Sequence, residues 1–154
     1  MKKTKLIDLK DIVIISTLAA GAYLGYQHFF PKLSETQRLS QTKSCVNCNL
    51  SSPHRPNLNH KDLQNFNFTG SNLSYQSLVK CDLRNTNFQN TYLKGASFYH
   101  SDLTGANFAG ADIRNANFNH ARLKNINWKG AIYNKTTTGV NRQQLFEAGA
   151  IMSD

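Results

Sequence analysis

The C-x-x-C motif of Cys45 and Cys48 places two thiols on one short stretch of chain, and such a pair can do three kinds of chemistry. A redox-active pair needs a helix N-terminus and a nearby βαβ pattern, and neither is present. A zinc site needs two more ligands, for which His54 and His60 are the only candidates. The third interpretation, which we favour, is a structural cap, bridged as a disulfide if the protein is exported and holding buried thiols otherwise.

The second group with chemical potential is the pair His100 and His120, which are twenty residues apart. If twenty-residue segments stack, as argued below, the two imidazoles lie about 4.8 Å apart, close enough to share a metal ion. Two histidines are too few for a tight site, and Lys80 separates them from His60 in the same predicted column. We therefore expect no metal and no cofactor, with His100 and His120 as the remaining metal candidates.

Catalytic groupings are otherwise missing from the sequence. There is no Ser-His-Asp or Cys-His arrangement, no glycine-rich phosphate loop and no paired-carboxylate cleft. Cys81 occupies a position that is small and inward-facing in the repeats described next, where it fills space rather than acting as a nucleophile. The sequence therefore predicts a protein that is not an enzyme.

Residues 56–130 form a repeat in which every fifth residue is large and apolar. An α-helix would spread such residues around its circumference, and a flat strand would alternate them between two faces. A chain that turns a corner every five residues instead brings all of them to one axis, as in a β-solenoid. The fifteen core positions are Leu58, Leu63, Phe68, Leu73, Leu78, Leu83, Phe88, Leu93, Phe98, Leu103, Phe108, Ile113, Phe118, Leu123 and Trp128.

The repeat unit, clearest in the segments 106–110 (ANFAG) and 111–115 (ADIRN), resembles the pentapeptide-repeat family. The resemblance implies an all-β fold, a right-handed quadrilateral β-helix in which the core residue and the small residue two places earlier face inward. Four sides predict a second period of twenty, and an aromatic column shows it. This column consists of Phe68, Phe88, Phe108 and Trp128. The fifteen repeats then make nearly four coils, with an apolar helix before them and a short capping helix after them.

The first thirty residues are predicted to be a signal anchor or a signal peptide. Lysines precede the uncharged run from Ile12 to Tyr26, and extension to Phe30 gives nineteen residues, just enough to span a bilayer. Ala20-Gly21-Ala22 offers an alternative small-x-small cleavage site. We favour the anchor, because aromatic residues follow the small ones. The solenoid is then membrane-anchored and extracytoplasmic (periplasmic), or secreted if the signal is cleaved.

The remaining segments are predicted to be a linker with an N-terminal cap (31–55) and a C-terminal cap (131–154). Leu50 looks like a repeat core residue but lies eight residues before Leu58, so the intervening segment shifts the register by three. Near the C-terminus, Asn141 can cap a short helix from Arg142 to about Ala148. Leu145 and Phe146 of this helix are expected to cover the open end of the solenoid. The C-x-x-C motif before the array also looks like an N-terminal feature of some pentapeptide-repeat proteins.

The formal net charge is +9, of which the repeats carry +4 with no glutamate. Some members of the family mimic DNA and bind topoisomerases through an acidic face, and this basic array departs from that pattern. Binding to nucleic acid or an anionic surface would need a basic groove with exposed aromatics, whereas the aromatics here are expected to point inward. The sequence therefore predicts a membrane-tethered structural or protein-interaction module with an unknown protein partner and unknown oligomeric state.

Overall fold

The computed structural model describes residues 38–39, 41–51 and 55–154. The chain divides into two compact units, and the first, Met1–Lys32, lies outside the described residues together with the predicted anchor. The second unit, Leu33–Asp154, contains the repeats and both caps. Among its described residues, no helix has the length and apolar character that crossing a bilayer requires.

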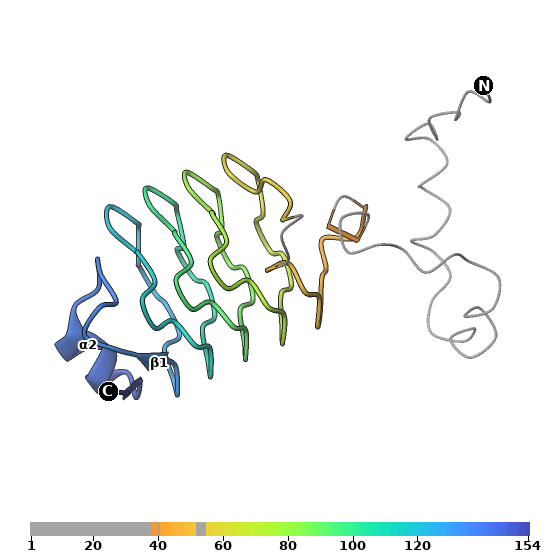
Figure 1. Ribbon diagram of the computed structural model, residues 1–154. Coiled ribbons are helices and arrows are strands. Elements are labelled where there is room, and N and C mark those ends of the chain that lie inside the picture. Colours follow the sequence, from red (N-terminus) through yellow and green to blue (C-terminus); the bar gives the residue numbers. More distant parts are fainter. Residues whose placement is uncertain (1–37, 40, 52–54) are drawn as a thin grey trace, which may run out of the picture. The chain divides into compact units, whose positions relative to one another are not determined.

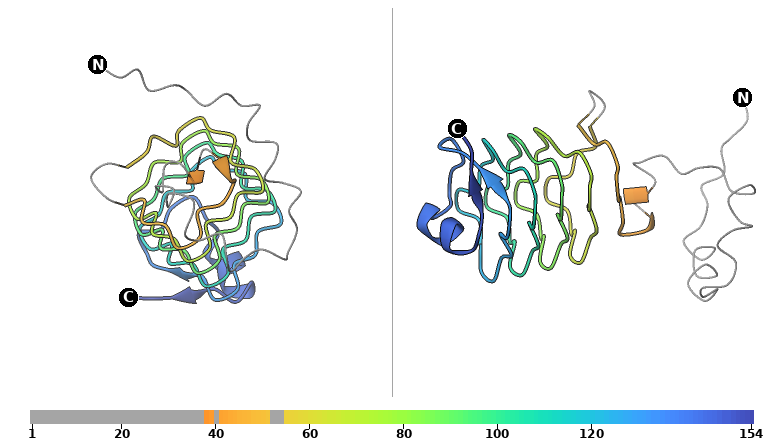
Figure 2. Two further views of the ribbon diagram at one scale, coloured as in Figure 1. Left: turned by 90° about the vertical axis from the view of Figure 1, so that its right-hand side faces the viewer. Right: turned by 90° about the horizontal axis from the view of Figure 1, so that it is seen from below.

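The repeats wind into stacked coils (Figure 1), and the bridges between coils recur every twenty residues. Parallel bridges join residues one coil apart, for example Asp62 to Asp82 and Asp82 to Asp102. Seen along the stack, the coils superimpose around a common centre (Figure 2, left). Each coil therefore contributes one short bridge to each of four sides, which is why regular strands are almost absent.

Four faces follow from these bridges, and each is named here by the residues that stack in register on its outer side. Face 1 carries charged residues, and face 2 carries asparagines above one serine of the N-terminal cap. Face 3 is mixed and the tallest, and face 4 carries small polar residues. The members are Asp62, Asp82, Asp102 and Arg122 (face 1); Ser44, Asn67, Asn87, Asn107 and Asn127 (face 2); Asn49, Asn72, Tyr92, Asp112, Ile132 and Ile151 (face 3); and Ser77, Ser97, Asn117 and Thr138 (face 4).

The corners between faces are turns whose third residue has a positive φ. In the turn from Leu63 to Phe66, the N–H of Phe66 donates to the carbonyl of Leu63 at 3.2 Å, and Asn65 has φ 57°. This is the geometry of a type II turn, which favours glycine or asparagine at that position. In all fifteen repeats the residue two positions after the core residue has a positive φ. Ten of these residues are glycine or asparagine, so corner geometry accounts for part of the abundance of asparagine.

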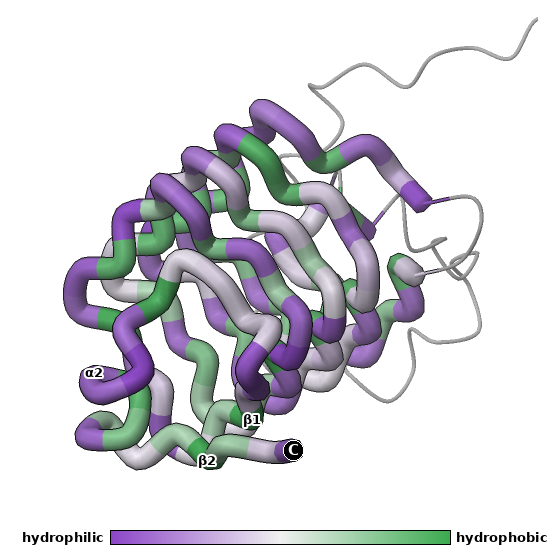
Figure 3. Tube along the Cα trace, turned by 60° about the vertical axis from the view of Figure 1, so that its left-hand side comes forward, coloured by the Kyte–Doolittle hydropathy of each residue, from purple (hydrophilic) through white to green (hydrophobic). Residues whose placement is uncertain are grey.

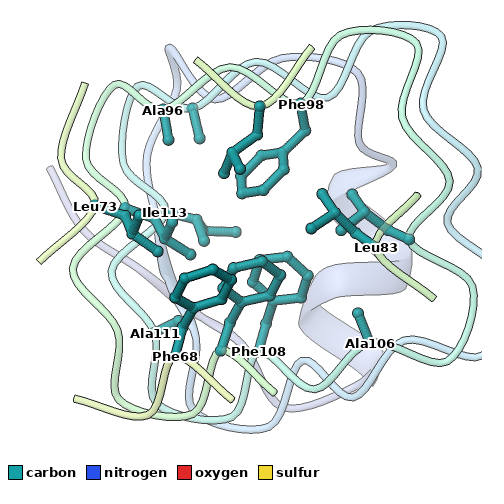
Figure 4. Close-up of a cluster of buried hydrophobic side chains, with 14 of the residues drawn as sticks. Phe68, Leu73, Leu83, Ala96, Phe98, Ala106, Phe108, Ala111 and Ile113 are labelled. Carbon is teal, nitrogen blue, oxygen red and sulfur yellow. The ribbon is translucent and has the colours of Figure 1, made fainter. Parts of the chain in front are cut away.

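The interior is a continuous column of packed side chains (Figure 4). Phe68, Phe88, Phe108 and Trp128 stack along one side, with ring centroids of successive pairs 5.5, 4.9 and 4.9 Å apart. A second stack joins Phe98 to its equivalent one coil later at 4.9 Å and meets the first stack edge to face. Fourteen of the fifteen core positions are buried, the exception being Leu123 in the last coil, which is half-buried.

Hydroxyl groups tie neighbouring coils together inside the column. The Oγ1 of Thr91 donates to the carbonyl of Phe68 at 2.8 Å, and the Oγ of Ser101 donates to the carbonyl of Leu78 at 2.5 Å. Cys81 makes the equivalent contact. Its Sγ lies 2.9 Å from the carbonyl oxygen of Leu58, twenty-three residues earlier. Burial raises the pKa of the Cys81 thiol, so this cysteine sits in a space-filling, unreactive setting.

The N-terminal cap is an extra rung stacked below the first coil. Bridges join Ser44 to Asn67 and Asn49 to Asn72, in each case twenty-three residues apart rather than twenty. The difference equals the three-residue register shift between Leu50 and the array. Phe66 stands where most repeats have a small residue, and its ring lies 4.6 Å from that of Phe68. The cap rung and the ring of Phe66 therefore close the N-terminal end of the core.

The C-terminal cap combines one helix and a two-stranded parallel sheet. Helix α2 (Arg142–Glu147) is capped by Asn141, whose side chain accepts from two backbone N–H groups of the first turn. Strand β1 (Ile132–Tyr133) pairs in parallel with β2 (Ile151–Met152), which extends face 3 by one rung. Leu145 is buried against the last coil, but Phe146 is 70% exposed. The expectation that both side chains cover the core was therefore wrong for Phe146.

Candidate functional site

The outer faces are the candidate functional surface, because side chains fill the interior. A small pocket between the last coil and α2 is lined by Leu123, Trp128, Val140, Asn141, Gln144 and Leu145, none of which titrates. Within the part of the chain that the structure describes, no group of three His, Cys, Asp or Glu side chains could hold a metal ion. Any recognition by the described part of the chain therefore uses outward side chains on the faces, corners and ends.

Faces 1 and 3 each carry an arginine clamped on an aspartate two residues earlier. Arg84 donates to both carboxylate oxygens of Asp82, at 2.8 and 2.6 Å, and Arg114 does the same to Asp112, at 2.9 and 2.6 Å. The side-chain hydrogen bond from the arginine is the main cause that lowers the pKa of each carboxyl group. These charges are committed to each other rather than available to a ligand.

We expect these pairs to make stability fall in acid. Because the folded-state pKa of Asp82 and of Asp112 lies below its unfolded value, both pairs stabilise the fold above the ordinary carboxyl pKa. That contribution disappears as the pH falls through the lowered folded pKa, so the thermal midpoint should drop as the pH falls below the ordinary carboxyl pKa of about 4. Asp112→Asn keeps the turn hydrogen bond and should flatten this drop. An Asp62→Asn control, which removes no ion pair among the described residues, should flatten it less; equal flattening would contradict the assignment.

Face 2 is an uncharged ladder of asparagine side chains. The Nδ2 of Asn107 donates to the Oδ1 of Asn87 at 3.2 Å, and Asn127 donates to Asn107 in the same way at 3.0 Å. Each Oδ1 also accepts a backbone N–H two residues later, as from Ala109 and Lys129. The ladder therefore satisfies its own polar groups and primarily holds the corner turns and neighbouring coils in place.

Face 3 and its corner expose two large aromatic side chains. Tyr92 is 58% exposed in the middle of the face, and Tyr75 is 59% exposed at the adjoining corner. The ring of Tyr75 lies against Gly95, where a Cβ atom would collide with it. Lys94, which follows Tyr92 by two residues, is also exposed, and its carbonyl accepts the N–H of Tyr75 at 2.8 Å. Two tyrosines and one lysine are thus exposed on face 3 and its corner, and we call these three residues the tyrosine patch.

The expectation that aromatic side chains point inward was thus wrong for three tyrosines. Tyr75 stands two residues after a core residue, Tyr92 one residue before and Tyr99 one residue after. All three positions face outward. The register of the repeat already contained this information. Applying it to every aromatic residue, and not only to the core positions, identifies the exposed tyrosines from the sequence.

The corner between faces 4 and 1 holds the two candidate metal ligands. The rings of His100 and His120 stack with centroids 4.8 Å apart and planes 16° apart, and Tyr99 lies edge-on to both. Both histidines have φ 60°, so the turn sets the direction of each side chain. The structure thus brings the pair together, but among the described residues no third protein ligand joins it.

Cys45 and Cys48 form a disulfide in the N-terminal cap. Both residues are at most 2% exposed, and they span a turn in which Asn47 has φ 55°. The cap rung is held by the N–H of Cys45, which donates to Asn67 at 2.8 Å, and by Ser71, whose Oγ bonds the carbonyl of Cys45. The bridge therefore closes a corner of the same kind as those in the coils and covers the lower end of the core.

Reduction of this disulfide should destabilise the protein by about 2 kcal/mol, the chain-entropy value for so short a loop. The two thiols would also need more room than the bonded sulfurs in the buried cap. Dithiothreitol should therefore lower the unfolding midpoint of the wild type and leave that of the double variant Cys45→Ala/Cys48→Ala unchanged. A wild-type midpoint that stays constant while thiol titration counts three free thiols would contradict a stabilising bridge.

The comparisons with known proteins agree with the coiled architecture. Residues 55–130 match the family model for pentapeptide repeats in eight copies, over the overlapping segments 55–90, 67–105, 81–119 and 91–130. No curated protein matches the chain.

Several solved structures are similar. A pentapeptide repeat protein of the Arabidopsis thaliana thylakoid lumen is 29% identical over 56% of this chain and 73% of that chain, with a TM-score of 0.46. One from the cyanobacterium Cyanothece 51142 is 24% identical over 68% of this chain and 96% of that chain, with a TM-score of 0.37. One from Nostoc PCC 7120 is 22% identical over 77% and 91%, with a TM-score of 0.42.

The matched segments coincide with the region whose bridges repeat every twenty residues and whose corners repeat every five. The fold of this region is accordingly the right-handed β-helix of such repeats. Sequence period, coil geometry and family model therefore lead to one assignment. The chain belongs to the pentapeptide-repeat family.

Proposed function

We propose that this protein is a non-catalytic protein-interaction module, held at a membrane by residues 1–30 with its solenoid on the extracytoplasmic side. The partner contacts the outer side of the coils, with the patch of Tyr75, Tyr92 and Lys94 on face 3 and its corner as the centre of the contact. The function needs no cofactor and no chemical step.

The observation that carries the proposal is the exposure of Tyr75 and Tyr92, 59% and 58%, at a corner and in the middle of face 3. Tyrosine is enriched among residues that dominate binding energy, because it buries a large rigid surface and keeps a polar tip. Here the coils hold the backbone of both tyrosines rigidly, so little conformational entropy is lost on binding. A flat face with rigid aromatic residues suits a protein surface better than a small molecule.

Export is supported by the disulfide between Cys45 and Cys48, because such bonds persist in oxidising compartments and are rare in reducing ones. The uncharged run from Ile12 to Tyr26, preceded by lysines, is the second support. The apolar run precedes the disulfide and the array, so this one N-terminal segment can account for both export and tethering. The compartment and the orientation are part of the proposal.

A pull-down of the tagged full-length protein from its own membranes tests the interaction. A photo-crosslinking amino acid at position 92 should capture a specific partner, while the same group at Asn107 on face 2 should capture little. Protease accessibility in intact and opened vesicles from the same preparation gives the orientation of the solenoid. Crosslinking that is equal on both faces would refute the role of face 3.

The double variant Tyr75→Asn/Tyr92→Asn removes the aromatic surface with the least risk to the fold. Asparagine already occupies the position of Tyr92 one coil earlier, in Asn72, and that of Tyr75 two coils later, in Asn115. The variant should therefore keep its unfolding midpoint. Its affinity for the partner should fall by more than about tenfold, as expected for two central aromatic contacts. Unchanged capture by a folded variant would move the binding surface elsewhere.

A further inference from the structure

Positive charge is denser around the C-terminal end of the solenoid than along the earlier coils. We name as the C-terminal rim five exposed residues: Arg122, Lys124, Lys129, Lys135 and Arg142. Lys124 and Lys129 each directly follow a core residue of the last coil. One coil earlier these two positions hold Thr104 and Ala109. The rim is therefore a property of the last coil and of the cap, not of the repeat pattern.

Apolar side chains are exposed at the same end. Phe146 on α2 is 70% exposed, and Ile151 and Met152 of β2 are 56% and 55% exposed. Figure 3 shows the hydrophobic colouring of β1 and β2 together at this end. Apart from the three tyrosines, these are the large hydrophobic residues that the described part of the chain exposes. Exposed apolar residues at an end that also carries five exposed cations are typical of an interaction site.

The cations of the rim are only weakly neutralised by the protein. The side chain of Arg122 is 80% exposed and lies 3.7 Å from Asp102, with which it forms its one ion pair among the described residues. The guanidinium of Arg142 donates to the backbone carbonyl of Lys135 at 2.6 Å and so adds to the charge there. Lys124 and Lys129 form no ion pair among the described residues. Residues 121–154 contain two carboxylate side chains, Glu147 and Asp154, against these five cations.

We propose that this end of the solenoid binds an anionic lipid bilayer. The cations attract acidic headgroups, and Phe146, Ile151 and Met152 enter the boundary between headgroups and acyl chains. A second copy of the chain fits this surface poorly, because two-fold pairing would bring the five cations against their own equivalents. A nucleic acid would match the charge but leave Ile151 and Met152 without an apolar partner. The inference is independent of the partner proposed for face 3 and of the N-terminal tether.

A fluorescent label at position 146 tests this directly in the full-length chain. Because Cys81 is buried and Cys45 and Cys48 are bridged, a Phe146→Cys variant can be labelled selectively with an environment-sensitive dye. The dye should shift to the blue with vesicles of phosphatidylcholine and phosphatidylglycerol in equal parts, and much less with phosphatidylcholine alone. The N-terminal segment is the same in every variant compared below, so its insertion cannot account for a difference between variants.

Charge reversal supplies the decisive comparison. In the triple variant Lys124→Glu/Lys129→Glu/Lys135→Glu, the equilibrium constant for insertion of the label should fall on the order of 100-fold, the combined effect of three surface lysines. The matched control Lys43→Glu/Lys61→Glu/Lys80→Glu changes the net charge equally but toward the N-terminal end, at exposed positions outside both proposed binding surfaces, and should leave insertion nearly unchanged. Equal losses in both variants, or no effect of phosphatidylglycerol, would overturn the proposal. A blue shift that grows with protein concentration without lipid would also overturn it, by assigning this end to pairing between copies.

Discussion

Replacing Phe108 with alanine should lower the free energy of unfolding by about 3–5 kcal/mol, the range for removing a fully buried phenylalanine. Phe108 is 0% exposed and sits in the middle of the aromatic column, with ring centroids 4.9 Å from both Phe88 and Trp128. It also meets Phe98 and Phe118 edge to face. The coils cannot collapse onto the resulting cavity, because backbone bridges fix their spacing. Urea unfolding followed by circular dichroism measures the loss.

Phe146→Ala is the matched control, because it deletes the same group from a 70% exposed position. Its unfolding free energy should stay within about 0.5 kcal/mol of the wild type, as for most surface substitutions. If both variants lose stability equally, the column is not the main source of stability. If Phe108→Ala costs less than about 1 kcal/mol, the coils can repack around the gap, contrary to the rigid stack described here.

The stacked architecture also determines where such damage spreads. Each coil contacts only the coils above and below it, so stability is a sum of coil and interface contributions. A cavity at Phe108 weakens the packing with both neighbouring coils. A cavity at Leu123, a half-buried side chain of the last coil, weakens the packing with one. Damage in the middle of the stack should therefore be more costly than the same damage near an end.

The core of this fold could be predicted because one physical rule places every core residue. A corner every five residues turns each fifth side chain inward, and the sequence obeys that rule from Leu58 to Trp128 without an exception. The caps follow no such rule. Phe66 fills the lower end from a position where the repeat usually has a small residue, and Phe146 turns outward although it follows the buried Leu145 in the same helix. Packing at the ends of the stack depends on the absence of a neighbouring coil, and the local sequence pattern does not specify which side chains fill that space.

The candidate surfaces were harder to predict for a related reason. Only the core and corner positions are constrained by the fold, so outward positions such as those of Tyr92 and Lys129 are free to vary without loss of the coils. The residue types at these positions therefore carry functional information. The positions themselves recur every five residues because the fold repeats with that period. The tyrosine patch and the C-terminal rim become visible only when outward residues are compared between equivalent positions of successive coils.

The last prediction concerns two glycines of the C-terminal cap that differ only in the space around them. Gly139 and Gly149 have nearly the same conformation, with φ of 78° and 79°. A Cβ atom on Gly139 would overlap the backbone of Phe118 and Asn119, whereas a Cβ atom on Gly149 would have nothing within 4 Å. Gly149→Ala should therefore cost about 1–2 kcal/mol, the penalty of a left-handed conformation alone. Gly139→Ala should cost about 4 kcal/mol or more, because backbone must also move.

Thermal and urea unfolding of the two variants separate these contributions, since the conformational penalty is common to both. The difference between them measures how tightly the segment after β1 is pressed onto the coil below, where the N–H of Phe118 donates to Thr138 at 2.9 Å. This contact completes face 4 and is the last rung on that side. Equal losses for both alanine variants would mean that the cap yields easily at Gly139. The rigid end required for the C-terminal rim to present its cations together would then be absent.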